Sequence, residues 1–244
     1  MFSWDTPDPK GIYEWSKLND SARPVIESIA SQWKELLCQE ECEEKYHQFL
    51  ADHAGLFFCD NYKRLVCISK LRLGADYKID FAVAEENYSY GLCWELIEIE
   101  SPHVPPYTKA GISSARLSCA IQQIQDWKRW LIDNRRDASK IFPARGIRTQ
   151  KDPNFRFTII IGNRENTDKW LEKRNQLAEE LNIAIRSYDY LTDTLMSRCF
   201  LDRSALGSSE ESDLWEWDQN HLVNPFSVAF PDRAWRKFLE QCPY

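Results

Sequence analysis

The 244-residue sequence predicts an α/β fold in which helices flank both faces of a mixed sheet. Three strand-like segments follow one another between residues 64 and 100 with no helix between them, which indicates an antiparallel meander. Later strand-like segments alternate with helical ones, which indicates crossover connections into the same sheet. The composition agrees, because 43% hydrophobic and 13% aromatic residues are typical of a folded chain.

The first elements are expected to be helices. Residues 1–34 form a leader, rich in Pro and Asp at its start, with a short helix near residues 22–33. Residues 35–52 contain many good helix formers and no Gly or Pro, so we expect one helix there, although an acidic run interrupts its apolar positions.

Three strands follow. Arg64–Leu73 is rich in Leu, Val and Ile. Residues 77–84 alternate, which predicts a strand with Asp80 turned away from the apolar face, and residues 85–87 predict a polar turn. Residues 92–100 form the third strand, which proline ends. The expected apolar face of the second strand consists of Tyr77, Ile79, Phe81 and Val83.

The remaining elements alternate between helix and strand. An apolar stripe with helical spacing predicts a long helix over residues 113–134. A loop-rich tail follows from residue 201. The other expected elements are strands at 155–162 and 183–186 and helices at 168–181, 190–200 and 233–240.

Composition also limits the class of protein. No apolar run approaches the roughly 20 residues that span a bilayer, and the N-terminus lacks the pattern of a signal peptide, so we expect a cytoplasmic protein without membrane contact. The eight cysteines are scattered without a C-x-x-C pair. Reduced thiols are the favoured interpretation and a zinc site is the weaker alternative. The four histidines show no ligand spacing, and we assign them no metal role.

Carboxylates gather at the end of the third strand. Glu98 and Glu100 lie on the same face, roughly 6.6 Å apart along the strand. If the second and third strands pair as a hairpin, Asp80 approaches Glu98. Such hard oxygen ligands bind Mg²⁺ or Mn²⁺, which activates water and stabilises charge on a phosphate. The alternative is a set of ordinary exposed carboxylates at a sheet edge.

Short segments in a fixed order carry a family resemblance. They are Asp80-Phe81 and residues 96–102, 107–111 and 120–127, with agreeing pieces at 44–53, 159–164 and 185–191. In this order they resemble the Shedu anti-phage nuclease domain of the PD-(D/E)xK superfamily, over about residues 43–195. The resemblance implies a restriction-endonuclease-like fold and a Mg²⁺- or Mn²⁺-dependent deoxyribonuclease that acts in bacterial defence, often as a homo-oligomer.

The resemblance also implies roles for individual residues. Asp80 and Glu98 match the metal ligands, and Gln123 matches a glutamine of the central helix that orients water or phosphate. Glu44, or its neighbour Glu43, matches helix carboxylates that complete the metal shell in related nucleases, and a solvated acidic face of the helix is the alternative.

Glu100 departs from the superfamily pattern, because it stands where the motif usually has lysine. A lysine there orients the attacking water and offsets negative charge. Glutamate can serve as a third ligand or a base but supplies no positive charge. We consider Lys109, in the following loop, as a replacement cation, with a solvated loop lysine as the alternative.

Candidate DNA-binding residues come from a locally basic strip. The chain has a net charge of −7, yet residues 128–156 contain nine Lys and Arg against three Asp. A solvated helix end and loop would also explain this strip. If the chain binds DNA, the strip would contact its phosphates. We therefore expect nucleic-acid contacts at Lys128, Arg135 and Arg136 of this strip, and at Lys109 in the loop after the third strand.

The expected organisation is a leader at 1–34, a nuclease domain at 35–200 and an extension at 201–244. The competing hypothesis is a catalytically inactive module with the nuclease fold, which binds nucleic acid or a protein partner. An enzyme acting on small phosphorylated substrates is disfavoured, because the sequence has no Gly-rich phosphate loop, and we expect no organic cofactor.

Overall fold

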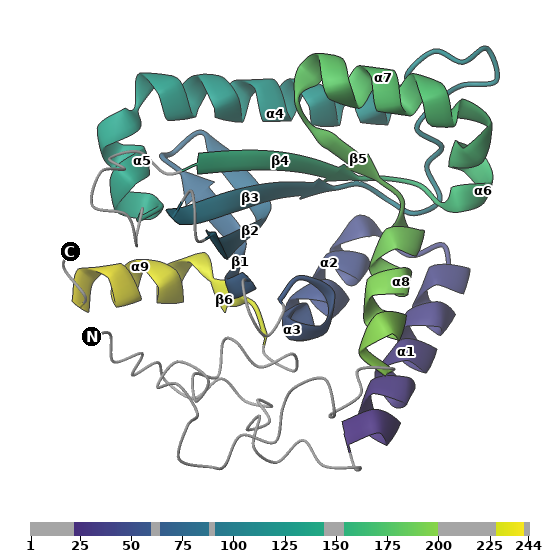
Figure 1. The fold of residues 1–244 in the computed structure, drawn as a ribbon, viewed down its shortest axis with the longest axis horizontal. Helices are drawn as coiled ribbons and strands as arrows, with labels where there is room; N and C mark the ends of the chain where they lie inside the picture. Colours follow the sequence, from purple (N-terminus) through teal and green to yellow (C-terminus); the bar gives the residue numbers. More distant parts are fainter. Residues whose placement is uncertain (1–21, 60–63, 88–90, 144–153, 200–227, 242–244) are drawn as a thin grey trace.

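A six-stranded sheet in the order β5-β4-β3-β2-β1-β6 forms the centre of the molecule (Figure 1). The computed structural model describes residues 22–59, 64–87, 91–143, 154–199 and 228–241. The strands are β1 (Arg64–Leu73), β2 (Tyr77–Asn87), β3 (Gly91–Ile99), β4 (Asn154–Ile160), β5 (Ala184–Arg186) and β6 (Phe230–Pro231).

Strands β1, β2 and β3 pair antiparallel in chain order, and β4 and β5 then join parallel to β3. The short β6 adds to the opposite edge, parallel to β1. The expected mixed α/β fold is therefore confirmed.

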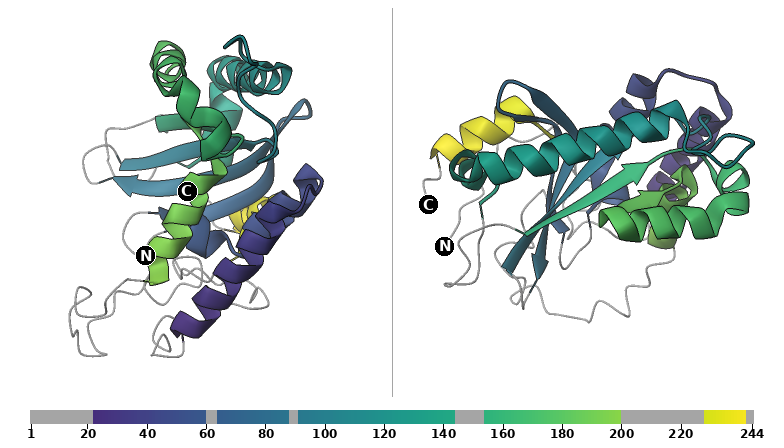
Figure 2. Two further views of the ribbon diagram at one scale, coloured as in Figure 1. Left: turned by 90° about the vertical axis from the view of Figure 1, so that its right-hand side faces the viewer. Right: turned by 90° about the horizontal axis from the view of Figure 1, so that it is seen from above.

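Helices cover both faces of the sheet (Figures 1 and 2). Two buried clusters lie on opposite faces. One contains Leu117, Ile124 and Trp127 of α4, and the other contains Trp33, Leu50 and Leu191 from three further helices. The helices are α1 (Ala22–Cys38), α2 (Glu43–Asp52), α3 (Ala54–Phe57), α4 (Ala115–Asp133), α5 (Arg135–Ile141), α6 (Arg164–Thr167), α7 (Leu171–Leu181), α8 (Tyr188–Cys199) and α9 (Asp232–Gln241), with a 3₁₀ turn η2 (Asp168–Trp170) before α7.

The N-terminal helices are divided differently from the sequence prediction. We expected helices at 22–33 and 35–52, whereas α1 continues to Cys38 and α2 begins at Glu43. The Tyr46 hydroxyl donates to the Gln39 carbonyl (2.5 Å) and accepts from the Glu41 amide (3.2 Å), which holds the break between the helices. The boundary predicted at residue 34 thus falls inside α1, whose buried face belongs to the same cluster as α2 and α8.

Other boundaries also shift. The polar turn expected at 85–87 is the end of β2, and the long helix expected over 113–134 ends at Asp133, with α5 following. A hydrogen bond from the Leu117 amide to the Ser114 side chain (3.2 Å) caps the start of α4. The part of the extension that is described contains β6 and α9, and both join the main sheet and core. Residues 1–21 and 201–227 lie outside the described residues.

The expectation of one apolar face on the second strand is wrong. Phe81 and Val83 belong to one cluster, whereas Ile79 packs in the other with Ala82. Because alternate strand residues share a face, this pattern means that β2 changes phase between Ile79 and Ala82. The neighbouring β1 does the same around Lys70, whose φ of 52° lies in the left-handed region.

Two expectations about the chain's class can be checked. Among the described helices none is long and apolar enough to cross a membrane. Among the described residues Cys38, Cys42, Cys93 and Cys119 are free thiols.

Candidate active site

Three charged side chains form a row across the meander. The β1–β2 register on both sides of Lys70 places it opposite Asp80. The β2–β3 register, continued by one position from Phe81↔Ile97, places Asp80 opposite Glu98. Opposite residues on neighbouring strands bring their side chains close together, so the fold itself gathers Lys70, Asp80 and Glu98.

Asp80 is the most heavily engaged of these residues. It is 6% exposed, and its Oδ1 lies 2.7 Å from the Lys70 Nζ. Its Oδ2 accepts a hydrogen bond from the Ile99 amide (3.0 Å), which ties β2 to the end of β3. Both carboxylate oxygens of Asp80 therefore have donors.

Lys70 is the cation of the row and also faces α2, because its Nζ lies 3.6 Å from the Glu44 Oε2. Burial opposes the charge on Lys70, but the surrounding carboxylates, Asp80 first among them, raise the pKa of Lys70 above its ordinary value. The left-handed backbone costs roughly 1 kcal/mol for a residue other than glycine. Such local strain is common where a side chain is held for function.

Glu98 has the most perturbed environment. It is 7% exposed, and its Oε2 has no hydrogen-bond partner within the described part of the chain. Burial first, and then the charges of Asp80 and Glu100, raise the pKa of Glu98 to about 10. The carboxyl group is thus protonated at neutral pH unless further positive charge comes close to it.

Glu100 extends the acidic group just beyond β3. Its amide donates to the Ile160 carbonyl (2.8 Å), so this residue continues the pairing of β3 with β4. Its Oε2 lies 3.9 Å from the Arg116 guanidinium in the first turn of α4. Burial and the charge of Glu43 raise the pKa of Glu100 to about 7 despite Arg116.

Helix α2 contributes its first residues to the same centre. Burial and the charge of Asp80 raise the pKa of Glu43, whereas Glu44 is exposed and pairs with Lys70. Below them, the His47 ring stacks on Phe81 with centroids 4.5 Å apart, and its Nε2 lies 3.3 Å from the Asp80 carbonyl oxygen. We call Glu43, Lys70, Asp80, Glu98 and Glu100 the acidic centre.

The donor set of the acidic centre suits a hard cation. It offers several carboxylates, one of them with a buried oxygen that has no partner among the described residues, and burial first and then the neighbouring carboxylates raise the pKa values of Glu98 and Glu100. In the side-chain positions described, however, no group of three or more His, Cys, Asp or Glu residues is arranged to hold a metal ion. The ammonium group of Lys70 is the cation found against Asp80.

The other predicted site residues lie at different distances from this centre. Gln123 is partly buried on α4, two turns beyond Arg116, and Lys109 is exposed in the loop between β3 and α4. Among the described contacts none joins either residue to the carboxylates.

The predicted DNA contacts on the basic strip lie far from the acidic centre. Lys128 donates to the carbonyls of Leu181 (2.7 Å) and Asn182 (3.2 Å) at the end of α7. Arg135 and Arg136 begin α5, beyond the other end of α4, whose 19 residues span about 28 Å. The remaining part of the strip, residues 144–153, falls outside the described residues.

The sequence reasoning missed Lys70 of the acidic centre and two residues that act on its carboxylates, Arg116 and Tyr188. Lys70 had a detectable signal, because it is a lysine inside an otherwise apolar strand, and Arg116 lies in the first turn of a capped helix. Tyr188 had none. Its hydroxyl group is buried with no partner in the described residues, and burial first, then the charge of Glu43, raises its pKa well above the ordinary value.

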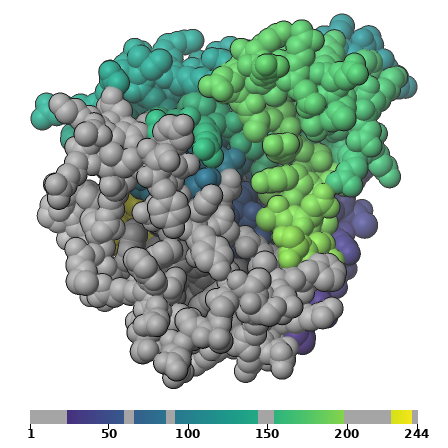
Figure 3. Space-filling view, viewed as in Figure 1, coloured from purple at the N-terminus to yellow at the C-terminus, as the bar shows by residue number. Residues whose placement is uncertain are grey.

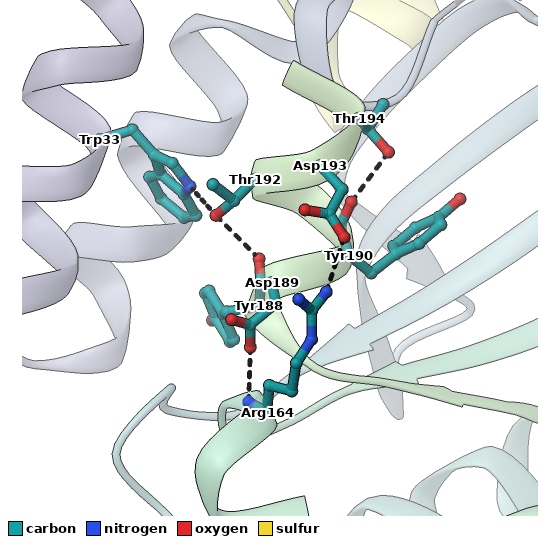
Figure 4. A network of polar contacts seen from close by, with 8 residues as sticks. All are labelled: Trp33, Arg164, Tyr188, Asp189, Tyr190, Thr192, Asp193 and Thr194. Atoms are coloured by element: carbon teal, nitrogen blue, oxygen red, sulfur yellow. Dashed lines mark hydrogen bonds and ion pairs between the residues drawn. The ribbon is translucent and has the colours of Figure 1, made fainter. Parts of the chain in front are cut away.

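Two segments that carried the family resemblance meet at the start of α8 (Figure 4). The Arg164 amide donates to the Asp189 carboxylate (2.5 Å), and the Arg164 guanidinium pairs with Asp193 (2.7 Å). On the other side, the Trp33 indole donates to Thr192 (3.0 Å). These contacts fix α8, and with it Tyr188, against α1 and α6.

Two comparisons with known proteins were made. A search of curated proteins found no match. The family model described as "Shedu protein SduA, C-terminal" matches residues 40–192, which include all five residues of the acidic centre. With more than half of its length matched, the chain belongs to the Shedu family.

Proposed function

We propose that this protein is a metal-dependent nuclease that hydrolyses phosphodiester bonds of DNA, with a restriction-endonuclease-like core. The observation that carries the proposal is the row of Lys70, Asp80 and Glu98, joined by Glu100 at the end of β3. Membership of the Shedu family suggests a role in anti-phage defence.

In this proposal Asp80 and Glu98 would hold Mg²⁺ or Mn²⁺, with Glu43 or Glu44 of α2 completing the ligands. When bound, the metal supplies a more acidic water and stabilises charge on the phosphate. The unpaired Oε2 of Glu98 supports this assignment, because a buried carboxylate oxygen without a donor is costly unless a cation reaches it.

Lys70 would supply the positive charge that the lysine of the superfamily motif usually supplies. Glu100 cannot provide positive charge, but the Lys70 ammonium, from β1, contacts Asp80 and Glu44. Lys70 would therefore stabilise the negative charge that develops on the phosphate. A pKa of about 7 suits Glu100 to accept a proton from water near neutral pH, and Gln123 would orient that water or the phosphate.

A second candidate, a non-catalytic module, is favoured by one observation. Both oxygens of Asp80 already have donors, Lys70 and the Ile99 amide, as in a purely structural ion pair. A module of this kind would bind DNA or a protein partner without cutting.

Cleavage assays separate the two functions. Wild type, Asp80→Asn and Glu98→Gln would be incubated with supercoiled, linear and single-stranded DNA, with Mg²⁺, Mn²⁺ or EDTA. Asp133→Asn, an exposed residue on α4, is the matched control. We expect metal-dependent cleavage by wild type and control, and loss of at least about 100-fold in both site variants, the scale on which one catalytic interaction contributes. Absence of cleavage by wild type, or equal cleavage by the site variants, would refute the nuclease proposal.

A further inference from the structure

The loop that leaves the acidic centre is unusually poor in negative charge. Residues 101–125 contain no Asp or Glu, although the chain as a whole carries a net charge of −7. The cationic side chains in this stretch are Lys109 and Arg116. Because the stretch begins directly after Glu100, these two cationic side chains belong to the segment that leaves the acidic centre.

Contacts within the loop and with α7 hold residues 107–113 in place. Tyr107 and Ser113 form a bridge, and the Thr108 amide donates to the Ile112 carbonyl (2.8 Å). Gly111 has a φ of +74° and lies flat against Trp170, where a Cβ atom would be 2.5 Å from the ring. The Lys173 ammonium donates to the Gly111 carbonyl, so α7 supports the loop directly. Lys109 therefore lies in an ordered turn that Lys173 contacts at Gly111.

Two further cationic side chains are Arg174 on α7 and Arg186 on the edge strand β5. The side chain of Arg174 hydrogen-bonds to Asn175 (3.0 Å), and the Arg186 guanidinium lies 5.4 Å from the centre of the Tyr190 ring. In the described part of the chain neither forms an ion pair. The nearby carboxylates of Asp189 and Asp193 are taken by Arg164 (Figure 4).

Arg174 and Arg186 lie close enough for their charges to interact. Burial and then the charge of Arg186 lower the pKa of Arg174, with Tyr107 and Asp168 acting in the opposite direction. Neighbouring like charges are unfavourable unless an ion of opposite sign lies near both. A phosphate group beside both arginines would offset the repulsion between them.

Arg186 also lies close to the acidic centre. Arg186 pairs with Ile160, which pairs with Ile99, so Arg186 is two strands, or about 10 Å, from the end of β3. Atoms of α7 and α8 form a continuous part of the face seen in Figure 3. The predicted contacts Arg135 and Arg136 lie at the opposite end of α4.

We propose that Lys109, Lys173, Arg174 and Arg186, here called the basic rim, bind the sugar-phosphate backbone of DNA beside the acidic centre. This inference rests on the proposed nuclease function and deepens it, because it assigns the surface that holds the substrate. Such contacts would be largely independent of sequence and sensitive to salt.

Binding measured without metal tests the basic rim separately from cleavage. Fluorescence anisotropy would follow a short labelled DNA duplex, and its single strand, in EDTA over a series of salt concentrations. The main variant is Arg174→Gln with Arg186→Gln. Because Arg174 is partly buried, a second variant combines Lys109→Gln with Arg186→Gln, both exposed. The matched control is Arg233→Gln with Lys237→Gln, exposed on α9 at the other edge of the sheet.

For each rim variant we expect at least about tenfold weaker binding at low salt. We also expect the slope of log affinity against log salt concentration to be smaller by roughly two, since each lost phosphate contact reduces that slope by about 0.9. The control should bind like wild type. Wild-type affinity in the second rim variant, equal loss in the control, or no DNA binding by wild type would overturn the proposal.

The two proposals fail separately. Cleavage by wild type together with undiminished binding by the rim variants would refute the proposed role of the basic rim but not the nuclease proposal. Rim-dependent binding without cleavage would retain the rim and favour the non-catalytic module.

Discussion

Replacing Glu98 by glutamine should stabilise the metal-free protein, and more strongly at higher pH. The side chain is 7% exposed and has an oxygen without a partner in the described residues. Its pKa rises on folding from the ordinary 4.5 to about 10. Between these values the folded protein binds a proton that the unfolded chain lacks, so folding becomes less favourable as the pH rises.

The magnitude follows from the proton taken up. At about pH 7.5, protonating a carboxyl group of pKa 4.5 costs three pH units at 1.36 kcal/mol each, or about 4 kcal/mol. At about pH 5 the same step costs about 0.7 kcal/mol. Glutamine has nearly the same shape and takes up no proton. Glu98→Gln should therefore be more stable than wild type by up to about 4 kcal/mol at the higher pH, and by less than about 1 kcal/mol at the lower.

Urea unfolding in EDTA at the two pH values measures this difference. Glu179→Gln, exposed on α7, is the control, and its effect should be the same at both pH values. A stability difference between Glu98→Gln and wild type that does not grow with pH would refute the reasoning. So would a variant that is less stable than wild type at the higher pH.

Three further changes test other features. Lys70→Gln should abolish cleavage while tightening Mn²⁺ binding measured by calorimetry, because it removes the cation held 2.7 Å from Asp80; unchanged cleavage would contradict this role. Gly111→Ala should destabilise the protein in thermal unfolding by more than Gly74→Ala. Both glycines have positive φ, so each alanine costs about 1–2 kcal/mol in the backbone. A Cβ atom at Gly111 would also be 2.5 Å from Trp170, whereas the nearest atom to a Cβ at Gly74 is 3.3 Å away. Equal losses of stability in the two variants would contradict the predicted clash. Ser114→Ala should cost about 1 kcal/mol of unfolding free energy through loss of the α4 cap, and no loss would show that the cap contributes nothing.

The carboxylates were predictable because strand geometry is regular. Glu98 and Glu100 follow from the alternation of a single strand, and a hairpin brings Asp80 beside them. The six-stranded order was only partly predictable. The two-residue β6 is too short to show a pattern, and it pairs with a strand some 160 residues earlier.

Lys70 shows why the rest of the site was not predictable. Its left-handed backbone shifts the phase of β1, and β2 shifts with it, but both faces of these strands are buried. Apolar residues therefore occur on either side of the shift, and the sequence pattern contains no sign of it. Similarly, the break between α1 and α2 depends on the Tyr46 hydroxyl group, because residues 35–52 contain no Gly or Pro to end a helix.

The late position of β6 in the chain has a consequence for biosynthesis. Ile68 pairs with Phe230, and Trp235 donates to the Ile141 carbonyl (3.1 Å) within the core. On the ribosome, β1 is synthesised long before these partners emerge, so its edge stays open during most of translation. Open strand edges promote association between chains, and contacts of such long sequence separation form slowly. The nascent protein should therefore depend on chaperones until residue 241 has emerged, and a chain truncated after residue 227 should sediment as aggregates.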